Sequence, residues 1–255
     1  RGLGDVYKRQ LLLGAMVPTK NLADVYLCTD GLPIDKSKLF KGFQTQTSEF
    51  ENRDSRMAQT FVVPGSEIFS EGGGWATVEP GFIGNNSTRT GYMIRKFMDE
   101  TLDAVQFIGE YDFKEFRYGE VLLILAEALY EKNGQITDEQ LDLTINYLRN
   151  RANMPCLTNA FVATNGLNMQ EEIRRERTVE LAFEGHRFWD IRRWKEGGVT
   201  SIARMEITKL GDDSFAYKKT TKPLTWDDRM YFYPIPDSEI RKNKNLTQNP
   251  GWEIK

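Results

Sequence analysis

The chain has 255 residues, of which 40% are hydrophobic and 28% charged, and its formal net charge is −3. This length and composition are sufficient for one or two domains with a hydrophobic core. The slightly negative charge argues against nucleic-acid binding, which requires a basic surface. No apolar run approaches the roughly 20 residues of a membrane-spanning helix.

The first ten residues, RGLGDVYKRQ, resemble a translated adapter sequence of the kind found at the ends of metagenomic assemblies. We therefore expect residues 1–10 to be a non-native assembly artefact and exclude them from functional reasoning. The two cysteines, Cys28 and Cys156, form no CxxC or metal-binding spacing. Both are interpreted as small buried residues, because free cysteine is among the most buried residue types.

Residues 11–112 are rich in Gly, Thr, Asn and Ser and are expected to form a loop-rich region. Phe61–Val63 predicts a short strand that ends at Pro64-Gly65. The glycines Gly72–Gly74 and the run Asn85–Ser87 predict a long irregular loop. Long loops inside a domain are commonly functional, so this region is the first place to seek a binding site.

Residues 113–255 are expected to be the helical part of the chain. The apolar spacing of Phe116–Glu131 predicts a helix that stops at Asn133-Gly134. Thr137 and Gln140 have the spacing of a capping box, which predicts a second helix over Thr137–Ala152. We expect the two helices to pair antiparallel and to bury Leu122, Leu125 and Ile145 between them or against Phe183.

A third helical region is predicted over Met169–Trp194, with a bend near Gly185 because glycine weakens a helix interior. After Gly197-Gly198 a hairpin-like segment is expected to reach about Thr225. The remaining tail is rich in turn residues, including Pro234 and Pro236.

The densest polar cluster is the stretch Glu171–Arg193. Glu180 and Glu184 lie four residues apart, as paired catalytic carboxylates on one helix face could. However, Arg177, Arg187 and Arg193 also fall within this stretch and would keep the carboxylates ionised, whereas a general acid needs a raised pKa. We interpret the cluster as a structural ion-pair network.

His186 is the single histidine, and no GxSxG motif accompanies it, so a nucleophilic or zinc site is not indicated. It is expected to cap or bridge helices beside Arg187 and Asp190. The nearby aromatic residues are interpreted as core packing because of their helical spacing: Phe183, Phe188, Trp189 and Trp194. Asn52–Arg56 is interpreted as a loop clamp, with an anion site as the alternative.

Several segments resemble the SusD/RagB family, in the order in which that family has them. They are PTKNLADVYLCTDGLPI, ENRDSRMAQTFVVPG, RYGEVLLILAEALYE, INYLRNRANMP, EEIRRERTVELAFEGHRFWDIRRWKEGG and YFYPIPDSEIRKNKNLTQNPGW. In the second segment Ser55 stands where the family commonly has Pro. The resemblance covers nearly all of the chain after Gln10.

The resemblance implies a mostly α fold of tetratricopeptide-like helical hairpins with long irregular loops and short β-hairpins. It further implies a non-enzymatic, surface-exposed outer-membrane lipoprotein that delivers glycans to a SusC-like TonB-dependent transporter. The lipid-bearing cysteine of the family is not among the 255 residues, which are expected to correspond to its C-terminal part. A glycoside hydrolase and a tetratricopeptide-type peptide-binding adaptor are the alternatives. No cofactor, metal or nucleic acid is expected.

A glycan site needs aromatic planes for the C–H faces of sugar rings and planar polar groups for the hydroxyls. The segment from Gly65 to Tyr92 contains both kinds of residue. The candidate ligand-binding residues are therefore Trp75, Phe69, Phe82, Asn85, Asn86 and Arg89. Trp75 follows three glycines and is the first candidate for stacking on a sugar, with packing into the fold as the alternative.

Overall fold

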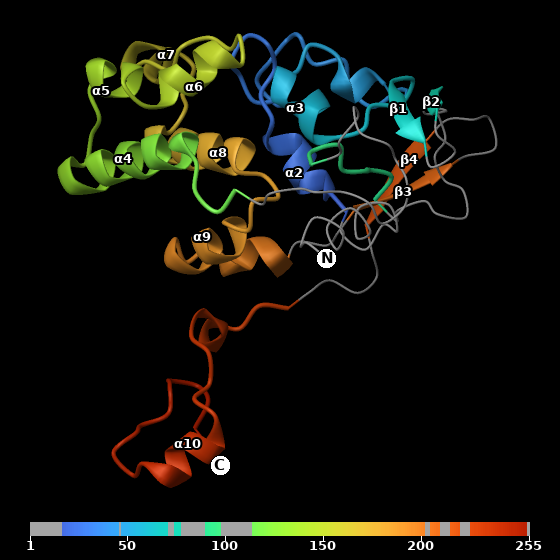
Figure 1. Ribbon diagram of the computed structural model, residues 1–255. Coiled ribbons are helices and arrows are strands. Elements are labelled where there is room, and N and C mark those ends of the chain that lie inside the picture. Colours follow the sequence, from blue (N-terminus) through green and yellow to red (C-terminus); the bar gives the residue numbers. More distant parts are fainter. Residues whose placement is uncertain are drawn as a thin grey trace.

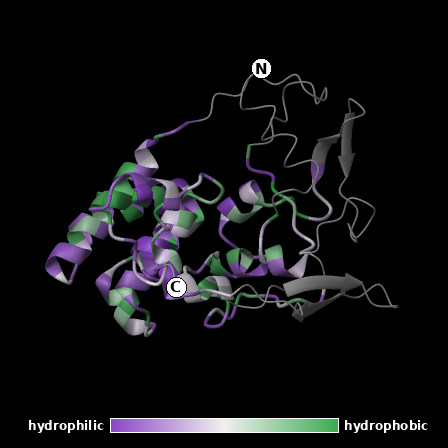
Figure 2. Cartoon of the chain, turned by 90° about the horizontal axis from the view of Figure 1, so that it is seen from below, coloured by the Kyte–Doolittle hydropathy of each residue, from purple (hydrophilic) through white to green (hydrophobic). Residues whose placement is uncertain are grey.

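The computed structural model describes residues 17–45, 47–70, 74–77, 90–97, 114–201, 205–209, 215–219 and 225–253. In these residues the fold is mostly helical, with two separate two-stranded antiparallel sheets (Figure 1). Figure 2 shows hydrophobic and hydrophilic residues on the same helices, as expected for helices that each bury one face. Within the described residues, no helix is long and apolar enough to cross a membrane.

The first predicted helix is confirmed as α4, Tyr118–Asn133. Gly134 ends it in the left-handed conformation, with φ 68°, and its amide donates to the Tyr130 carbonyl. Glycine adopts this conformation without the strain that a Cβ would add, so the Asn-Gly signal stops the helix where expected.

The predicted capping box is also confirmed: the Gln140 amide donates to Thr137 Oγ1, and the Thr137 amide donates to Gln140 Oε1. The single helix expected over Thr137–Ala152 is wrong, because it is divided into α5, Asp138–Asp142, and α6, Ile145–Arg151. Thr144 lies between them with a non-helical ψ of −91°, and its hydroxyl donates to the Gln140 carbonyl at 2.7 Å. Threonine thus competes locally with the helical hydrogen bonds.

The third helical region is not one bent helix but two helices with a break between them. α8, Met169–Glu180, and α9, Arg187–Arg193, are separate helices. Two residues between them have positive φ, namely Phe183 at 63° and Gly185 at 85°. The single bent helical region predicted over Met169–Trp194 is therefore divided into two helices, and the break lies where the bend near Gly185 was expected.

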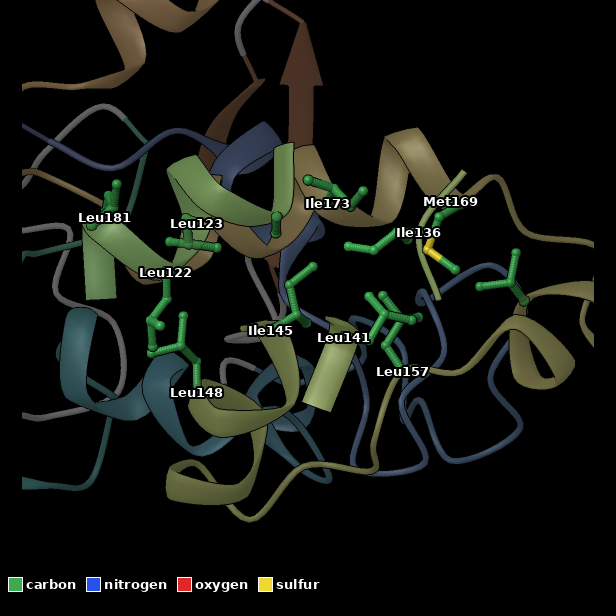
Figure 3. Close-up of a cluster of buried hydrophobic side chains, with 12 residues drawn as sticks. Leu122, Leu123, Ile136, Leu141, Ile145, Leu148, Leu157, Met169, Ile173 and Leu181 are labelled. Carbon is green, nitrogen blue, oxygen red and sulfur yellow. The ribbon is translucent and has the colours of Figure 1, made fainter. Parts of the chain in front are cut away.

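The main core lies between α4, α5, α6 and α8, and α7, Asn159–Thr164, packs at its edge (Figure 3). In Figure 3 Leu148 lies beside Leu122, and Leu141 lies toward Ile136 at the other end of α4, so α6 runs antiparallel to α4. Leu122 and Ile145 are buried as expected. The expectation for Leu125 is wrong: it is 45% exposed, because it lies on the face of α4 opposite Leu123.

Residues 17–97 contain short elements around a second core. The elements are α2, Lys20–Val25; η1, Ser48–Phe50; α3, Ser55–Thr60; β1, Glu67–Ser70; and β2, Gly74–Thr77. The strand predicted at Phe61–Val63 is wrong, since Phe61 follows α3 directly and forms only an isolated bridge with Ile94. Asp54 accepts the Arg56 amide and so begins α3 at Ser55, six residues before Phe61.

The C-terminal region contains the expected hairpin, formed by β3, Met205–Lys209, and β4, Phe215–Lys219. It follows η2, Gly197–Ser201, and precedes η3, Asp228–Tyr231, and α10, Asp237–Lys242. Figure 1 shows the segment with α10 extending away from the helical body. Both cysteines are free, and Cys28 is buried as expected, but Cys156 is exposed, which corrects that expectation.

Candidate functional site

Two of the predicted ligand residues occupy a β-hairpin rather than an irregular loop. Phe69 is in β1 and Trp75 is in β2, and the antiparallel register places these two positions directly opposite each other. Opposed residues in such a pair have Cα atoms about 4.5–5.5 Å apart. The structure therefore brings together two aromatic residues that are six positions apart in the sequence. The other four candidates, Phe82, Asn85, Asn86 and Arg89, lie outside the described residues.

The hairpin is attached to the aromatic core of residues 17–97. Phe61 is fully buried, and its ring makes edge-on contacts with Tyr26 and Tyr92 at centroid distances of 5.6 and 5.5 Å. The next residue, Val62, donates its amide to the Met93 carbonyl, and Pro64-Gly65 then forms the turn into β1. Because aromatic packing fixes the chain just before this turn, the core determines where the hairpin begins.

A buried charged cluster connects α3 to α8 beneath this region. Arg56 Nη1 donates to Glu176 Oε1 at 2.6 Å and to Glu180 Oε2 at 3.0 Å, while Arg56 Nη2 donates to Asp54 at 2.7 Å. Each of these four side chains is less than 10% exposed. All three bonds are charge-assisted, and those to Glu176 and Glu180 join residues 120 and 124 positions apart, so they fix the position of α3 on α8.

The same cluster continues to α4 and to the segment 90–97. Arg117 Nη1 donates to Glu180 at 2.6 Å, and Arg117 Nε donates to Glu184 at 2.5 Å. Lys96 Nζ donates to Glu184 at 2.6 Å. The segment that follows the undescribed residues 78–89 is therefore held by an ion pair to Glu184, just beyond α8, and by a hydrogen bond from Lys96 to the Glu180 carbonyl at 3.2 Å.

The electrostatics of this cluster do not suit acid catalysis. Burial by itself would raise the pKa of Glu180, but hydrogen bonds from Arg151 and Arg117 lower it to about 2. The pKa of Glu184 is also below its ordinary value, because Arg117 and Lys96 outweigh the effect of burial. Both carboxylates stay ionised at neutral pH, whereas a general acid must hold a proton. The interpretation as a structural ion-pair network is confirmed.

The partners of these carboxylates differ from those suggested by sequence spacing. The local arginines pair elsewhere: Arg177 with Asp190, and Arg193 with Asp190 and Glu127. The buried face of α8 instead meets Arg56, Arg149, Arg117 and Arg151 from other elements. Of these four arginines, Arg56 could have been selected from the sequence, because it belongs to the Asn-Arg-Asp-Ser-Arg stretch.

That stretch, Asn52–Arg56, is the loop clamp that was predicted. The guanidinium of Arg53 donates to the carbonyls of Glu49, Ala23 and Tyr26 at 2.6–2.9 Å. Arg56 is occupied by carboxylates. Because both guanidinium groups are bound within the protein, the structure does not support the alternative of an anion site.

His186 does bridge helices, though not as the helix cap. Its side chain makes no capping bond, and its Nδ1 lies 3.5 Å from Glu120 Oε1 of α4. Within the described residues, no group of His, Cys, Asp and Glu side chains could hold a metal ion.

The prediction that the aromatic residues in and beside α9 pack in the core is wrong for two of them. Phe188 is 48% exposed and Trp189 is 60% exposed, while Phe183 and Trp194 are half-buried. Helical spacing shows which residues share a face of a helix. It does not show whether another element covers that face. Arg192 lies between Phe188 and Tyr233, 4.5 and 4.4 Å from the two ring centroids.

The described residues form a mostly helical fold that carries a hairpin with two opposed aromatic positions. Residues 6–252 match the model of the SusD family, and the chain belongs to that family. The mostly α fold class predicted above is confirmed, and it is that of the SusD-like structural relatives.

Two curated relatives and one solved structure illustrate the similarity. "SusD-like protein P2" of Formosa agariphila is 35% identical over 143 residues, which cover 53% of this chain and 25% of that protein. "Starch-binding protein SusD" of Bacteroides thetaiotaomicron is 31% identical over 142 residues, covering 56% of this chain and 22% of that protein. A crystal structure of a SusD-like protein from Bacteroides fragilis is 30% identical with a TM-score of 0.76, covering 94% of this chain and 48% of that one. The chain thus spans about half the length of this solved relative.

Proposed function

We propose that this protein is a non-catalytic glycan-binding protein of the outer-membrane surface. It delivers oligosaccharides or polysaccharides to a SusC-like TonB-dependent transporter. The observation that carries the proposal is the match to the SusD family over residues 6–252. A curated relative named for starch binding supports carbohydrate as the ligand class.

The hairpin formed by β1 and β2 is the proposed centre of the glycan site. Phe69 and Trp75 occupy opposed positions in it, and aromatic planes suit the C–H faces of pyranose rings. Phe82, Asn85, Asn86 and Arg89 follow the hairpin in the sequence. The three polar residues supply donors and acceptors for sugar hydroxyls.

The glycoside hydrolase alternative is disfavoured by the state of the charged cluster. Glycosidases need one carboxyl group that is protonated at working pH beside one that is ionised. Glu176, Glu180 and Glu184 all have lowered pKa values because arginine or lysine side chains donate to them. The peptide-binding adaptor is also disfavoured, since it would need a concave stack of several hairpins.

Affinity electrophoresis tests the proposed function directly. The purified chain is run through native gels containing starch, xylan or laminarin, and retardation in one gel identifies a bound glycan. Trp75→Ala should weaken that binding about fivefold or more, because a stacking aromatic residue contributes at least ~1 kcal/mol. Its melting temperature should remain near that of the wild type.

Trp189→Ala is the matched control for this experiment. It removes the same side chain from an exposed position on α9, which Figure 1 shows apart from the β1–β2 hairpin. The control should bind the glycan as the wild type does. Equal retardation of both variants and the wild type would place the site elsewhere, and release of reducing sugar from the glycan would favour the hydrolase.

Delivery to a transporter is tested in cells. The protein should be labelled by an impermeant reagent on intact bacteria, as expected for an outward-facing lipoprotein. It should also co-purify with a TonB-dependent transporter after mild detergent extraction. Labelling only after lysis would contradict the proposed location.

A further inference from the structure

The loop of residues 36–43 is basic, although the formal net charge of the chain is −3. It contains three lysines and no acidic residue, and the acidic residues nearest to it in the sequence are Asp35 and the buried Glu49. Lys38 and Lys41 are exposed, and within the described residues neither forms an ion pair or a side-chain hydrogen bond. Two positive charges are therefore available to a ligand.

The same loop contains two phenyl rings. Phe40 and Phe43 contact each other edge-on at a centroid distance of 5.1 Å. Lys20 Nζ lies 4.1 Å from the centroid of the Phe43 ring. The Arg53 guanidinium lies 5.4 Å from the centroid of the Phe40 ring, so a cation helps to hold each ring in place. Phe43 is nevertheless 38% exposed, and Leu39 is 41% exposed.

Hydrogen bonds hold the loop in place although it contains no helix or strand. Lys36 Nζ donates to two backbone carbonyls of the turn after α7, at 3.1 and 3.3 Å. Asn52 Nδ2 donates to the Leu39 carbonyl at 3.1 Å, and Ser48 Oγ donates to the Gly42 carbonyl at 3.0 Å. A loop that is ordered before binding loses less conformational entropy when a ligand binds.

These groups together fit a sugar that carries an anionic group. An exposed ring packs against the C–H face of a sugar, and a lysine ammonium binds a carboxylate or sulfate oxygen as a point charge. A neutral sugar would leave both ammonium groups without a counter-charge. A polybasic segment that binds a membrane surface has about four to eight basic residues, more than this loop contains. The groups therefore favour an anionic glycan over a lipid surface.

We infer that residues 36–43 form a second glycan-binding surface, which selects sugars with carboxylate or sulfate groups. The inference rests on the proposed function and names a ligand class for it. Lys38 and Lys41 bind the anionic groups, and Phe43 packs against the sugar ring. The loop precedes η1 and the β1–β2 hairpin follows α3, so the two surfaces are separate segments joined to one aromatic core, which includes Phe50 and Phe61.

Affinity electrophoresis with charged and neutral polysaccharides tests the inference. The 255-residue chain is run in native gels that contain alginate, which carries carboxylates, or carrageenan, which carries sulfates. Parallel gels contain starch, xylan or laminarin, and a gel without polysaccharide gives the reference mobility. At least one anionic polysaccharide should retard the chain. Retardation by alginate alone would identify carboxylate as the recognised group, and retardation by carrageenan alone would identify sulfate.

A double variant tests the two lysines. Lys38→Gln together with Lys41→Gln removes both charges from the loop and should weaken binding of the anionic polysaccharide about fivefold or more, because two exposed ion pairs are lost. Its melting temperature should remain near that of the wild type. Lys132→Gln together with Lys244→Gln is the matched control, because both lysines are exposed outside the loop and the chain loses the same charge. The control should bind as the wild type does.

The outcomes separate this inference from the proposed function. Retardation by a neutral polysaccharide but by neither anionic one would overturn the inference and leave the proposed function standing. Absence of retardation in every gel would overturn both. Equal affinities of the double variant and the control would show that the loop does not bind the anionic groups. Co-sedimentation of the wild type with phosphatidylglycerol vesicles, lost in the double variant and without binding of alginate or carrageenan, would assign the loop to a lipid surface.

Discussion

Helices α4 to α8 pack through aliphatic side chains, whereas residues 17–97 pack through aromatic rings around Phe61. The two regions meet at apolar side chains, because Val179 of α8 belongs to the aromatic cluster and Leu27 packs with Ala152 and Met154. They also meet at charged side chains, with Arg56 of α3 set between Glu176 and Glu180 of α8. Apolar packing is not directional, but hydrogen-bonded ion pairs require one geometry. The contrast indicates that the apolar clusters give each region its compactness, and that the charged cluster fixes how the hairpin-bearing region lies on the helical body.

The largest effect should come from breaking this charged contact. Glu176→Gln removes the buried charge that Arg56 and the fully buried Arg149 share. Arg56 then keeps only Asp54 and Glu180, and Arg149 keeps only Glu172 at 3.5 Å, so the buried cluster has an excess of positive charge. Removing one member of a buried ion pair costs about 3–5 kcal/mol because the remaining charge stays desolvated. Urea unfolding of the variant should show this loss.

Glu131→Gln is the control for that measurement. Glu131 is half exposed and lies 3.9 Å from Arg174 at the protein surface. An exposed pair of this kind contributes about 0–1 kcal/mol. Similar stabilities for the two variants would contradict the role assigned to the charged contact.

The second prediction compares two leucines on α4. Leu123 is fully buried in the aliphatic core, whereas Leu125 is 45% exposed. Leu123→Ala should therefore lower the free energy of unfolding of the 255-residue chain by about 2–5 kcal/mol, and Leu125→Ala by less than about 1 kcal/mol. Thermal or urea unfolding of both variants measures the difference, and equal losses would show that both faces of α4 are buried.

The sequence predicted the features that depend on neighbouring residues. Asn133-Gly134 stops α4, and the Thr137–Gln140 capping box begins α5, because both signals operate within four residues. Non-local features were missed: the exposure of Phe188 and Leu125 depends on which other elements cover them, and helical spacing carries no such information. The family resemblance, by contrast, rests on several ordered motifs and was sufficient to predict the fold class.

The candidate site was predicted only in part. Phe69 and Trp75 were selected for their aromatic side chains, but their pairing depends on the register of a hairpin that the glycine-rich sequence concealed. Arg56 was recognised as part of a clamp, but its carboxylate partners lie 120 and 124 residues away on α8. Contacts at that separation depend on the packing of whole elements.

The third prediction concerns acid. The pKa of Glu180 is lowered in the folded protein from an ordinary 4.5 to about 2, so its ionised form stabilises the fold. This contribution is fully present above pH 4.5 and is lost as the pH falls toward 2, because the unfolded state takes up the proton first. We expect a loss of about 2–3 kcal/mol from this group across that window.

Urea titrations at pH 6, 4 and 3 measure the acid effect, with Glu180→Gln as the comparison. The variant is less stable at pH 6, and its stability should fall less steeply between pH 4 and 3 than that of the wild type. Parallel pH profiles for the two proteins would show that Glu180 is not among the groups responsible.

The smallest expected effect belongs to the capping box of α5, which lies in the helical body away from the charged contact. Thr137→Ala removes the oxygen that accepts the Gln140 amide and should lower the free energy of unfolding by about 1 kcal/mol. Thr137→Ser retains that oxygen and should restore most of the stability, which separates loss of the cap from loss of packing. Because the two bonds of the cap join Thr137 and Gln140, both in the helical body, glycan affinity should be the same in both variants. A loss of glycan binding in Thr137→Ala, with stability close to that of the wild type, would show that the two regions are coupled beyond the charged cluster.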